Sequence, residues 1–275
     1  MNRESNSYTV IYAIIMVVLV AVGLAFTAQV LKSRQDKNVQ IDKMQQILGS
    51  VGTHEKDMAK VEGLYKSIIK QELLVMPDGS IKETFEGDKI ADNEAFEMNT
   101  ANQFKEVASG KDLPLPVYVA EVDGQKKYIF PMNGAGLWGP IWGYIAVDAD
   151  GDTVFGTNFS HQGETPGLGA EIATAKFENQ FKNKKLFVNG QFESVAVVKA
   201  GRQPSIPGQS YVDGISGGTL TSNGVNNMLL SSLKPYVKFL DSLKASVSSD
   251  VKAEEPAVAE AAQDMTQQDS TTIDK

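Results

Sequence analysis

The stretch DGISGGTLTSNGV, Asp213–Val225, stands directly before the last apolar segment of the 275-residue chain. Its four glycines predict a tight turn. The apolar positions that follow at helical spacing predict a helix from about Asn223 to Leu243, with a kink or division at Pro235. Thr221 or Ser222 would then be the N-cap. This leaves Thr219 just before a helix N-terminus, where free N–H groups and the helix dipole favour a phosphate.

A threonine hydroxyl at this place can hydrogen-bond a phosphate or be esterified to one. A turn with a capped helix also accounts for the same residues, so the stretch by itself leaves both interpretations open. A serine hydrolase is not expected, because the chain has no G-x-S-x-G elbow and its two histidines lack the context of a triad.

The composition excludes several functional classes. A formal net charge of -8 argues against nucleic acid as a partner. The absence of cysteine excludes disulfides, thiolate metal sites and cysteine nucleophiles. With only His54 and His161, a histidine-based metal site is not expected. The aspartates of DADGD, residues 148–152, do not fit an EF-hand loop and predict a tight turn between strands.

An uncharged segment, Tyr8–Ala28, predicts a transmembrane helix, because it would span about 31 Å. Its length and the lack of an A-x-A site favour an uncleaved anchor over a signal peptide. Lys32, Arg34 and Lys37 follow the span, and this bias would keep the rest of the chain in the cytoplasm. Long domains, however, can cross a membrane largely regardless of flanking charge.

The rest of the chain predicts one globular domain behind a helical connector. The pattern is helical from Asn38 to about Glu72 and again over Ile172–Lys182. Strand patterns flank three turns, at residues 123–125, 148–152 and 189–190, and predict three hairpins. After Ser246 the chain is acidic and lacks aromatic residues, which is typical of a disordered tail.

Two further stretches are candidates for a binding site. GLWGPIWGY, residues 136–144, holds both tryptophans of the chain and could form an apolar wall on which a planar ring stacks. HQGETPGLGAE, residues 161–171, has three glycines that let backbone amides approach a ligand, and its Pro166-Gly167 favours a type II turn. A core strand and a surface loop are the competing interpretations.

Together these stretches resemble a known family. DGISGGTLTS is similar to the flavinylation motif D-x-x-[ST]-G-A-[ST] of the FMN-binding domain family, with Gly218 where that family usually has alanine. GLWGPIWGYIAVD and HQGETPGLGAEI resemble the C subunits of the sodium-translocating NADH:quinone oxidoreductases. The related G subunits of Rnf-type complexes, which usually lack the Gly-Leu-Trp segment, are the alternative family. A membrane-anchored binding module without a redox role is the other alternative.

The resemblance implies a covalent FMN, joined by a phosphoester to Thr219, that relays electrons inside a membrane complex. It implies no catalytic residue and no metal ligand in this chain. As partners it implies the other subunits, a flavin transferase that uses FAD, and the lipid bilayer of the bacterial inner membrane, with the flavin domain on the periplasmic side. The cofactor-binding residues would be Gly136, Leu137, Trp138, Glu164, Thr165, Pro166, Gly167, Leu168, Gly169, Asp213, Ser216, Gly217, Gly218, Thr219, Leu220 and Thr221.

The expected fold is α+β, a mostly antiparallel sheet with flanking helices behind a single N-terminal transmembrane helix. The expected parts are an N-terminal segment (1–7), the transmembrane helix (8–31), a helical connector (32–76), an FMN-binding domain (77–246) and an acidic tail (247–275).

Overall fold

The computed structural model describes residues 6–246, and the first five residues and the acidic tail expected over residues 247–275 lie outside them. The chain divides after Met44 into two compact units. Helix α1 (Asn6–Ser50) makes up most of the first unit and contributes its last turns to the second. Among the described helices, α1 alone is long and apolar enough to cross a membrane. The span expected over residues 8–31 lies within it.

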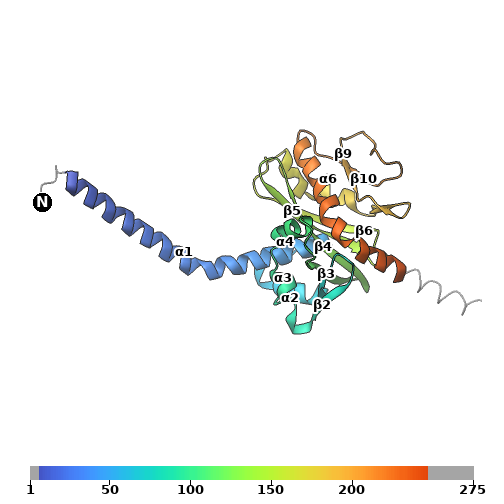
Figure 1. Cartoon of the computed structure of the whole chain (residues 1–275), viewed down its shortest axis with the longest axis horizontal. Helices are drawn as coiled ribbons and strands as arrows, with labels where there is room; N and C mark the ends of the chain where they lie inside the picture. The colour runs from blue at the N-terminus through green and yellow to red at the C-terminus, as the bar shows by residue number, and fades with distance from the viewer. Residues whose placement is uncertain (1–5, 247–275) are drawn as a thin grey trace, which may run out of the picture. The chain divides into compact units, whose positions relative to one another are not determined.

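The second unit is built on one six-stranded antiparallel sheet, in the order β2-β1-β3-β4-β5-β6 (Figure 1). The strands are β1 (Ile69–Val75), β2 (Ile81–Glu86), β3 (Leu115–Val122), β4 (Gln125–Ala135), β5 (Pro140–Asp148) and β6 (Val154–His161). Helices pack on both faces of the sheet. The predicted α+β fold with a mostly antiparallel sheet is therefore confirmed.

The three predicted hairpins are present, and two of their turns share one backbone geometry. Asp123 and Gly124, between β3 and β4, have φ angles of 52° and 74°. Asn189 and Gly190, between the short strands β7 (Phe187–Val188) and β8 (Gln191–Phe192), have φ angles of 50° and 81°. Two consecutive residues with positive φ match the twist of the flanking strands, which is why Asp-Gly and Asn-Gly are favoured there.

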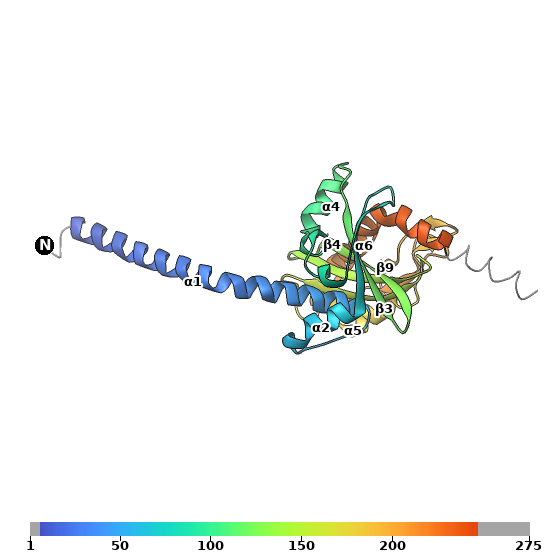
Figure 2. The same cartoon turned by 90° about the horizontal axis from the view of Figure 1, so that it is seen from below.

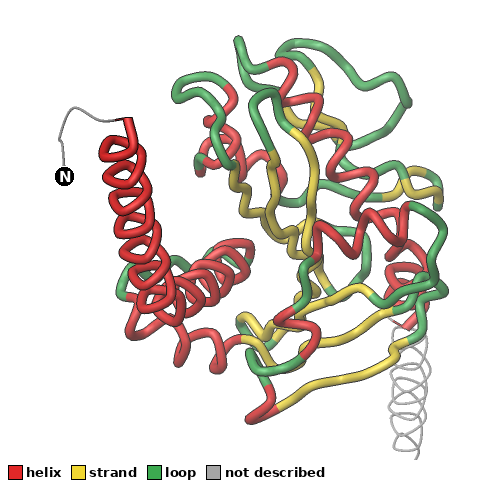
Figure 3. The backbone as a smooth tube through the Cα atoms, turned by 60° about the vertical axis from the view of Figure 1, so that its left-hand side comes forward, coloured by secondary structure: helices red, strands yellow, loops and turns green. Residues whose placement is uncertain are grey.

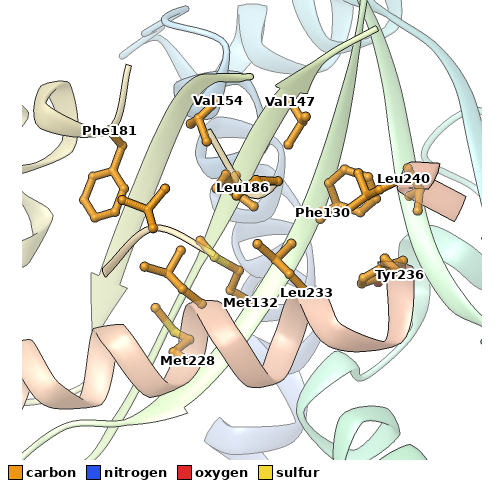
Figure 4. Close-up of a cluster of buried hydrophobic side chains, with 14 of the residues drawn as sticks. Phe130, Met132, Val147, Val154, Phe181, Leu186, Met228, Leu233, Tyr236 and Leu240 are labelled. Atoms are coloured by element: carbon orange, nitrogen blue, oxygen red, sulfur yellow. The ribbon is translucent and has the colours of Figure 1, made fainter. Parts of the chain in front are cut away.

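One face of the sheet is covered by α6 (Thr219–Leu233), by the 3-10 turn η4 (Lys234–Tyr236) and by a further helical stretch over residues 237–246. In Figure 4, Met228, Leu233 and Tyr236 face Phe130 and Met132 of β4. Gly134 lets the helix approach closely, since a Cβ on it would lie 2.7 Å from Cβ of Met228. Pro235 lies in η4 and divides the helix, as predicted.

The other face of the sheet packs against α2 (Met58–Ile68), α3 (Glu94–Glu97) and the last turns of α1 (Figure 2). Alternation along β3 separates the two faces: Val117 and Val119 belong to the core under α6, and Tyr118 contacts Tyr144 on the opposite face. The short 3-10 turn η1 (Gly87–Lys89) and α4 (Thr100–Ala108) connect β2 to β3.

The helical pattern predicted up to Glu72 is wrong for its last residues. Helix α2 ends at Ile68, and Ile69 begins β1, which pairs with β2 on one side and β3 on the other. Pairing on both edges and burial of Leu73 and Leu74 on opposite faces override the local helical spacing. The central sheet thus reaches into the segment expected as a connector.

Short elements join β6 to α6 (Figure 3). They are η2 (Gly169–Ala173), α5 (Ala175–Glu178), η3 (Asn179–Phe181), β7, β8, β9 (Ala196–Val198) and β10 (Tyr211–Asp213). The helix predicted over Ile172–Lys182 is therefore broken once: η2 ends at Ala173, and α5 continues directly into η3. The extended backbone of Thr174, with ψ 145°, interrupts it, while Phe177 and Phe181 still pack against Phe159 of β6.

Candidate functional site

Helix α6 begins at Thr219, four residues earlier than predicted. Its N-cap is Gly218, and no side chain caps it. The predicted N-caps, Thr221 and Ser222, are wrong because their hydroxyls have other partners. Thr221 Oγ1 donates to Glu164 Oε2 at 2.6 Å, and Ser222 Oγ donates to the Gly218 carbonyl and accepts from the Ile215 N–H. The Ser222 N–H donates to the Gly218 carbonyl at 2.9 Å, so the N–H groups of Thr219, Leu220 and Thr221 before it lack an intrahelical acceptor, and no side chain caps them.

Thr219 is exposed at the first position of this uncapped helix. Gly217 before it has φ 77°, a conformation that glycine adopts without strain. A Cβ on Gly218 would lie 3.1 Å from Ile215 and 3.3 Å from the Gly169 nitrogen. The turn that precedes α6 is therefore compact and packs against the segment around Gly169.

The ETPGLG segment, residues 164–169, folds into the predicted type II turn. The Leu168 N–H donates to the Thr165 carbonyl at 3.1 Å, and Gly167 has φ 76° at the third position. The Gly167 N–H donates to Glu171 Oε1 at 3.1 Å, which holds the turn to η2. Leu168 lies beside Gly217, since a Cβ on Gly217 would be 2.7 Å from Leu168 Cδ2.

Glu164 connects the three sequence motifs. Its side chain is buried, with 5% of the residue exposed. Oε1 accepts from the Trp138 N–H at 2.9 Å, and Oε2 accepts from Thr221 Oγ1. An added Cβ on Gly136 or Gly169 would overlap this carboxylate. The predicted site residues of all three stretches therefore meet around one buried side chain.

Large apolar side chains are exposed around this meeting point. The exposed fractions are 49% for Leu137, 68% for Trp138, 42% for Leu168 and 60% for Leu220. Two of these side chains are held close to Glu164. The Trp138 N–H donates a hydrogen bond to its carboxylate, and Leu220 directly precedes Thr221, whose hydroxyl donates to the same carboxylate. Trp138 is thus placed as a wall at the surface. Trp142 is not, because its Nε1 donates to Gln46 on the other face of the sheet.

A cavity of about 290 Å³ opens beside Thr219. Its lining comes from the predicted motif and from β9 with the residues after it: Val197, Val198, Lys199, Ala200, Gly214, Ile215, Ser216, Gly217, Thr219, Ser222 and Asn223. The volume is close to the lower end of the range of ligand pockets. An adjoining cavity of about 500 Å³ shares Val197, Val198 and Asn223.

The place of β9 beside the site is not predicted from the sequence, although residues 191–198 carry a strand pattern. Val197 and Val198 lie beside the motif because β9 pairs in parallel with β10, whose last residue is Asp213. Two three-residue strands separated by a long loop give no pairing signal in the sequence. Lys199, which follows β9, is the cationic side chain among the described residues that line the cavity.

Asp213 does not join the cluster through its side chain. It pairs through its backbone with Gln180, and its carboxylate makes no hydrogen bond or ion pair with the described residues. The His161 side chain does join it, because Nδ1 accepts from the Glu164 N–H at 3.2 Å and so anchors the start of the turn. Among residues 6–246, no group of three His, Asp or Glu side chains could hold a metal ion.

Known proteins match both the fold and this site. The model of the FMN-binding domain family matches residues 136–234, which include all three motifs. The site therefore defines an FMN-binding domain. A C subunit of the Na(+)-translocating NADH-quinone reductase from Pseudomonas aeruginosa is 31% identical over 83% of this chain and 91% of its own length. That from Yersinia pestis is 32% identical over 82% of this chain and 88% of its own length.

Solved structures agree. The C subunit from Parabacteroides distasonis is 51% identical, with a TM-score of 0.66, over 76% of this chain and 96% of that one. NqrC from Shewanella oneidensis is 26% identical, with a TM-score of 0.57, over 76% of this chain and 99% of that one. The chain belongs to the family of Na(+)-translocating NADH-quinone reductase C subunits, and it has a region that matches the FMN-binding domain family and one helix long enough and apolar enough to cross a membrane. These relatives are not Rnf subunits.

Proposed function

We propose that this chain carries one FMN, joined by a phosphoester to Thr219, and relays electrons between redox centres of the sodium-translocating complex. The exposed Thr219 hydroxyl at the first position of an uncapped helix supports the proposal most directly. Backbone N–H groups of the first turn of α6 and the positive end of its dipole would hold the phosphate. The bound flavin would accept and pass on electrons, since that chemistry belongs to the cofactor.

The residues around Thr219 fit a flavin. Gly217 and Gly218 keep the approach to Thr219 free of side chains. Lys199 and the β9 backbone line the cavity beside the hydroxyl. Thr165 and Leu168 are the two ends of the turn in the ETPGLG segment, which lies next to the start of α6. The exposed ring of Trp138 would form an apolar wall that keeps water away from a bound flavin ring. Asp213, Ser216, Leu137, Leu220 and Pro166 complete the proposed site.

The anchor and the location follow from the same family. We place the membrane span at residues 8–31 of α1, the connector at 32–76 and the FMN-binding domain at 77–246. The domain would face the periplasm from the bacterial inner membrane. Partners would be the other subunits of the NADH:quinone oxidoreductase and a flavin transferase that supplies FMN from FAD.

Flavin fluorescence in a denaturing gel tests the attachment. The full chain co-expressed with a flavin transferase should give a fluorescent band that Thr219→Ala abolishes. Thr219→Ser, which keeps the hydroxyl, should retain the band. Ser231→Ala is the matched control, because it removes an exposed hydroxyl near the other end of the same helix. A fluorescent Thr219→Ala band would contradict the assignment. A colourless wild-type chain would favour a binding module without a redox role.

A further inference from the structure

Glu164 is a buried carboxylate without a cationic partner among the described residues. Both oxygens are used: Oε1 accepts from the Trp138 N–H at 2.9 Å and Oε2 accepts from Thr221 Oγ1 at 2.6 Å. Thr221 is 1% exposed and Glu164 5%. A carboxylate is almost never buried this deeply unless it is paired or hydrogen-bonded, so these two bonds are what keep Glu164 inside the fold.

The surroundings are shaped to the carboxylate. Glycines face it from both sides, Gly136 from the turn after β4 and Gly169 from the start of η2, and a Cβ on either would overlap its oxygens. The backbone N–H of Glu164 is fixed by His161 Nδ1. The Glu164 side chain thus connects the β4–β5 turn and the ETPGLG turn to the first turn of α6. It does so at Thr221, which is two residues after Thr219.

We propose that Glu164 is a positioning residue for the flavin, acting through Thr221 and Trp138 rather than by touching the cofactor. It would hold the ETPGLG turn and the Trp138 wall in register with the Thr219 hydroxyl. This inference rests on the proposed attachment of FMN to Thr219. It assigns Glu164 and Thr221, which the motifs alone would place in contact with the cofactor, to the layer behind it.

The position of these groups explains the expected effect. When Thr221 loses its hydroxyl, Glu164 Oε2 is left buried without a donor, and the carboxylate must move to find one. The ETPGLG turn then separates from the start of α6. Because the ETPGLG turn is then no longer held at a fixed position relative to the Thr219 hydroxyl, both the attachment of FMN and the surroundings of the attached ring change.

The test compares Thr221→Val with Thr221→Ser in the full chain, co-expressed with a flavin transferase. Valine keeps the shape of threonine and removes the donor, and serine restores it. Thr157→Val on β6 is the matched control, because Thr157 is also a buried threonine, 5% exposed, whose hydroxyl donates to a carbonyl outside the three motifs. The readouts are the initial rate of FMN attachment, the absorption and fluorescence spectrum of the attached flavin, and its midpoint potential.

We expect Thr221→Val to slow attachment about tenfold, the effect of losing one buried hydrogen bond. The spectrum and potential of the remaining attached flavin should also shift. Thr221→Ser should return all three toward wild type, and Thr157→Val should change only the melting temperature. Wild-type attachment and spectrum in Thr221→Val would overturn the inference. An equal loss of the attachment rate in Thr157→Val would also overturn it, because the effect would then come from a general loss of stability.

If Thr221→Val does not fold, Glu164→Met decides the matter. Methionine is close to glutamate in length but removes both carboxylate oxygens, so neither the Trp138 N–H nor the Thr221 hydroxyl keeps its acceptor. Slower attachment with a shifted spectrum supports the inference, and wild-type values overturn it. A wild-type chain that takes up no FMN would instead show that the proposed function has failed, and the inference would fail with it.

Discussion

Gly217 and Gly218 stand side by side in the turn before α6, but their backbone conformations differ. Gly217 has φ 77°, which costs a residue with a Cβ about 1–2 kcal/mol. Gly218 has φ -104°, which any residue adopts. An added Cβ on Gly218 meets Ile215 and the Gly169 nitrogen at 3.1 to 3.3 Å, so a shift of a few tenths of an ångström would accommodate alanine. Glycine is therefore required by the backbone conformation at position 217, whereas at position 218 it only relieves a close contact.

Gly217→Ala should lower the free energy of unfolding by about 1–2 kcal/mol, because alanine must adopt the left-handed conformation. Gly218→Ala, which introduces the residue usual in the flavinylation motif, should change it by less and keep FMN attachment. Urea denaturation of both variants, with denaturing-gel fluorescence, measures the difference. A larger loss in Gly218→Ala would contradict the geometry of this turn.

Trp138 has an exposed ring but a fixed backbone, since its N–H is bonded to Glu164. Trp138→Ala should therefore leave the unfolding free energy within about 0.5 kcal/mol of wild type, as for most surface substitutions. In the flavin-loaded chain the same change should increase quenching of flavin fluorescence by iodide, because one wall of the proposed site is lost. Equal quenching in both chains would remove Trp138 from the site.

The sequence marks the stretches that the fold brings together, but not the contacts that their side chains make. Hydroxyls, glycines and tryptophans marked the three stretches, and the structure joins those stretches around Glu164. The N-cap of α6 is Gly218 and not the predicted Thr221 or Ser222, and this error shows which information the sequence does not contain. Thr221 is a good capping residue locally, but a carboxylate 57 residues away takes its hydroxyl. Only the tertiary fold brings that partner into place.

At the scale of elements, the turn between β5 and β6 is held by Asp150. Its carboxylate accepts from the N–H groups of Asp152 and Thr153 and from the Thr153 hydroxyl. Partial burial alone would raise the pKa of Asp150, but these hydrogen bonds outweigh it and hold the pKa below its ordinary value of 3.8. Lys185 also lies 3.2 Å from this carboxylate. The DADGD segment is therefore a hydrogen-bonded turn, as its sequence predicts.

Because the folded pKa is depressed, Asp150 stabilises the fold fully above its unfolded pKa of 3.8. This stability is lost as the pH falls through the lower, folded value. In Asp150→Asn the free energy of unfolding should therefore decrease less as the pH is lowered. Urea denaturation at a series of pH values, from about two units above 3.8 downward, measures this decrease. Thr153→Val, which removes one donor to Asp150, should act in the same direction. An unchanged acid slope in both variants would contradict this account of the turn.

Elements with strong local signals were predicted well. The Asp-Gly and Asn-Gly turns mark the hairpins, and Pro235 divides the last helix where expected. Elements that depend on distant partners were not. Strand β1 has a helical spacing and becomes a strand because β2 and β3 pair with it. The parallel pairing of β9 with the three-residue strand β10 was not predicted, although it brings Val197 and Val198 to the site.

At the scale of the whole molecule, α1 carries the proposed membrane span. The full chain should remain in the membrane pellet after an alkaline carbonate wash, and a chain that lacks residues 1–37 should not, because it has lost the apolar segment. Protease added to intact spheroplasts should cleave the full chain if the domain faces the periplasm. Cleavage only after lysis would place the domain in the cytoplasm, as the charges of Lys32, Arg34 and Lys37 alone would suggest.

The α+β fold behind one long apolar helix was predictable, because hydropathy and strand patterns can be read from the sequence without tertiary information. The second compact unit begins at Gln45, because the last turns of α1 and helix α2 pack on the sheet and β1 is one of its strands. The start of the FMN-binding domain at residue 77 stays a prediction. Amphipathic helices that pack on a sheet and helices of a solvated connector show similar patterns.

The intact mass of the full chain, purified in detergent after co-expression with a flavin transferase, tests the central claim most directly. The account predicts a mass greater than that of the polypeptide by one FMN less one water, and the loss of this increment in Thr219→Ala. The same increment in Thr219→Ala would place the flavin on another residue. An unmodified wild-type chain would contradict the covalent carrier itself.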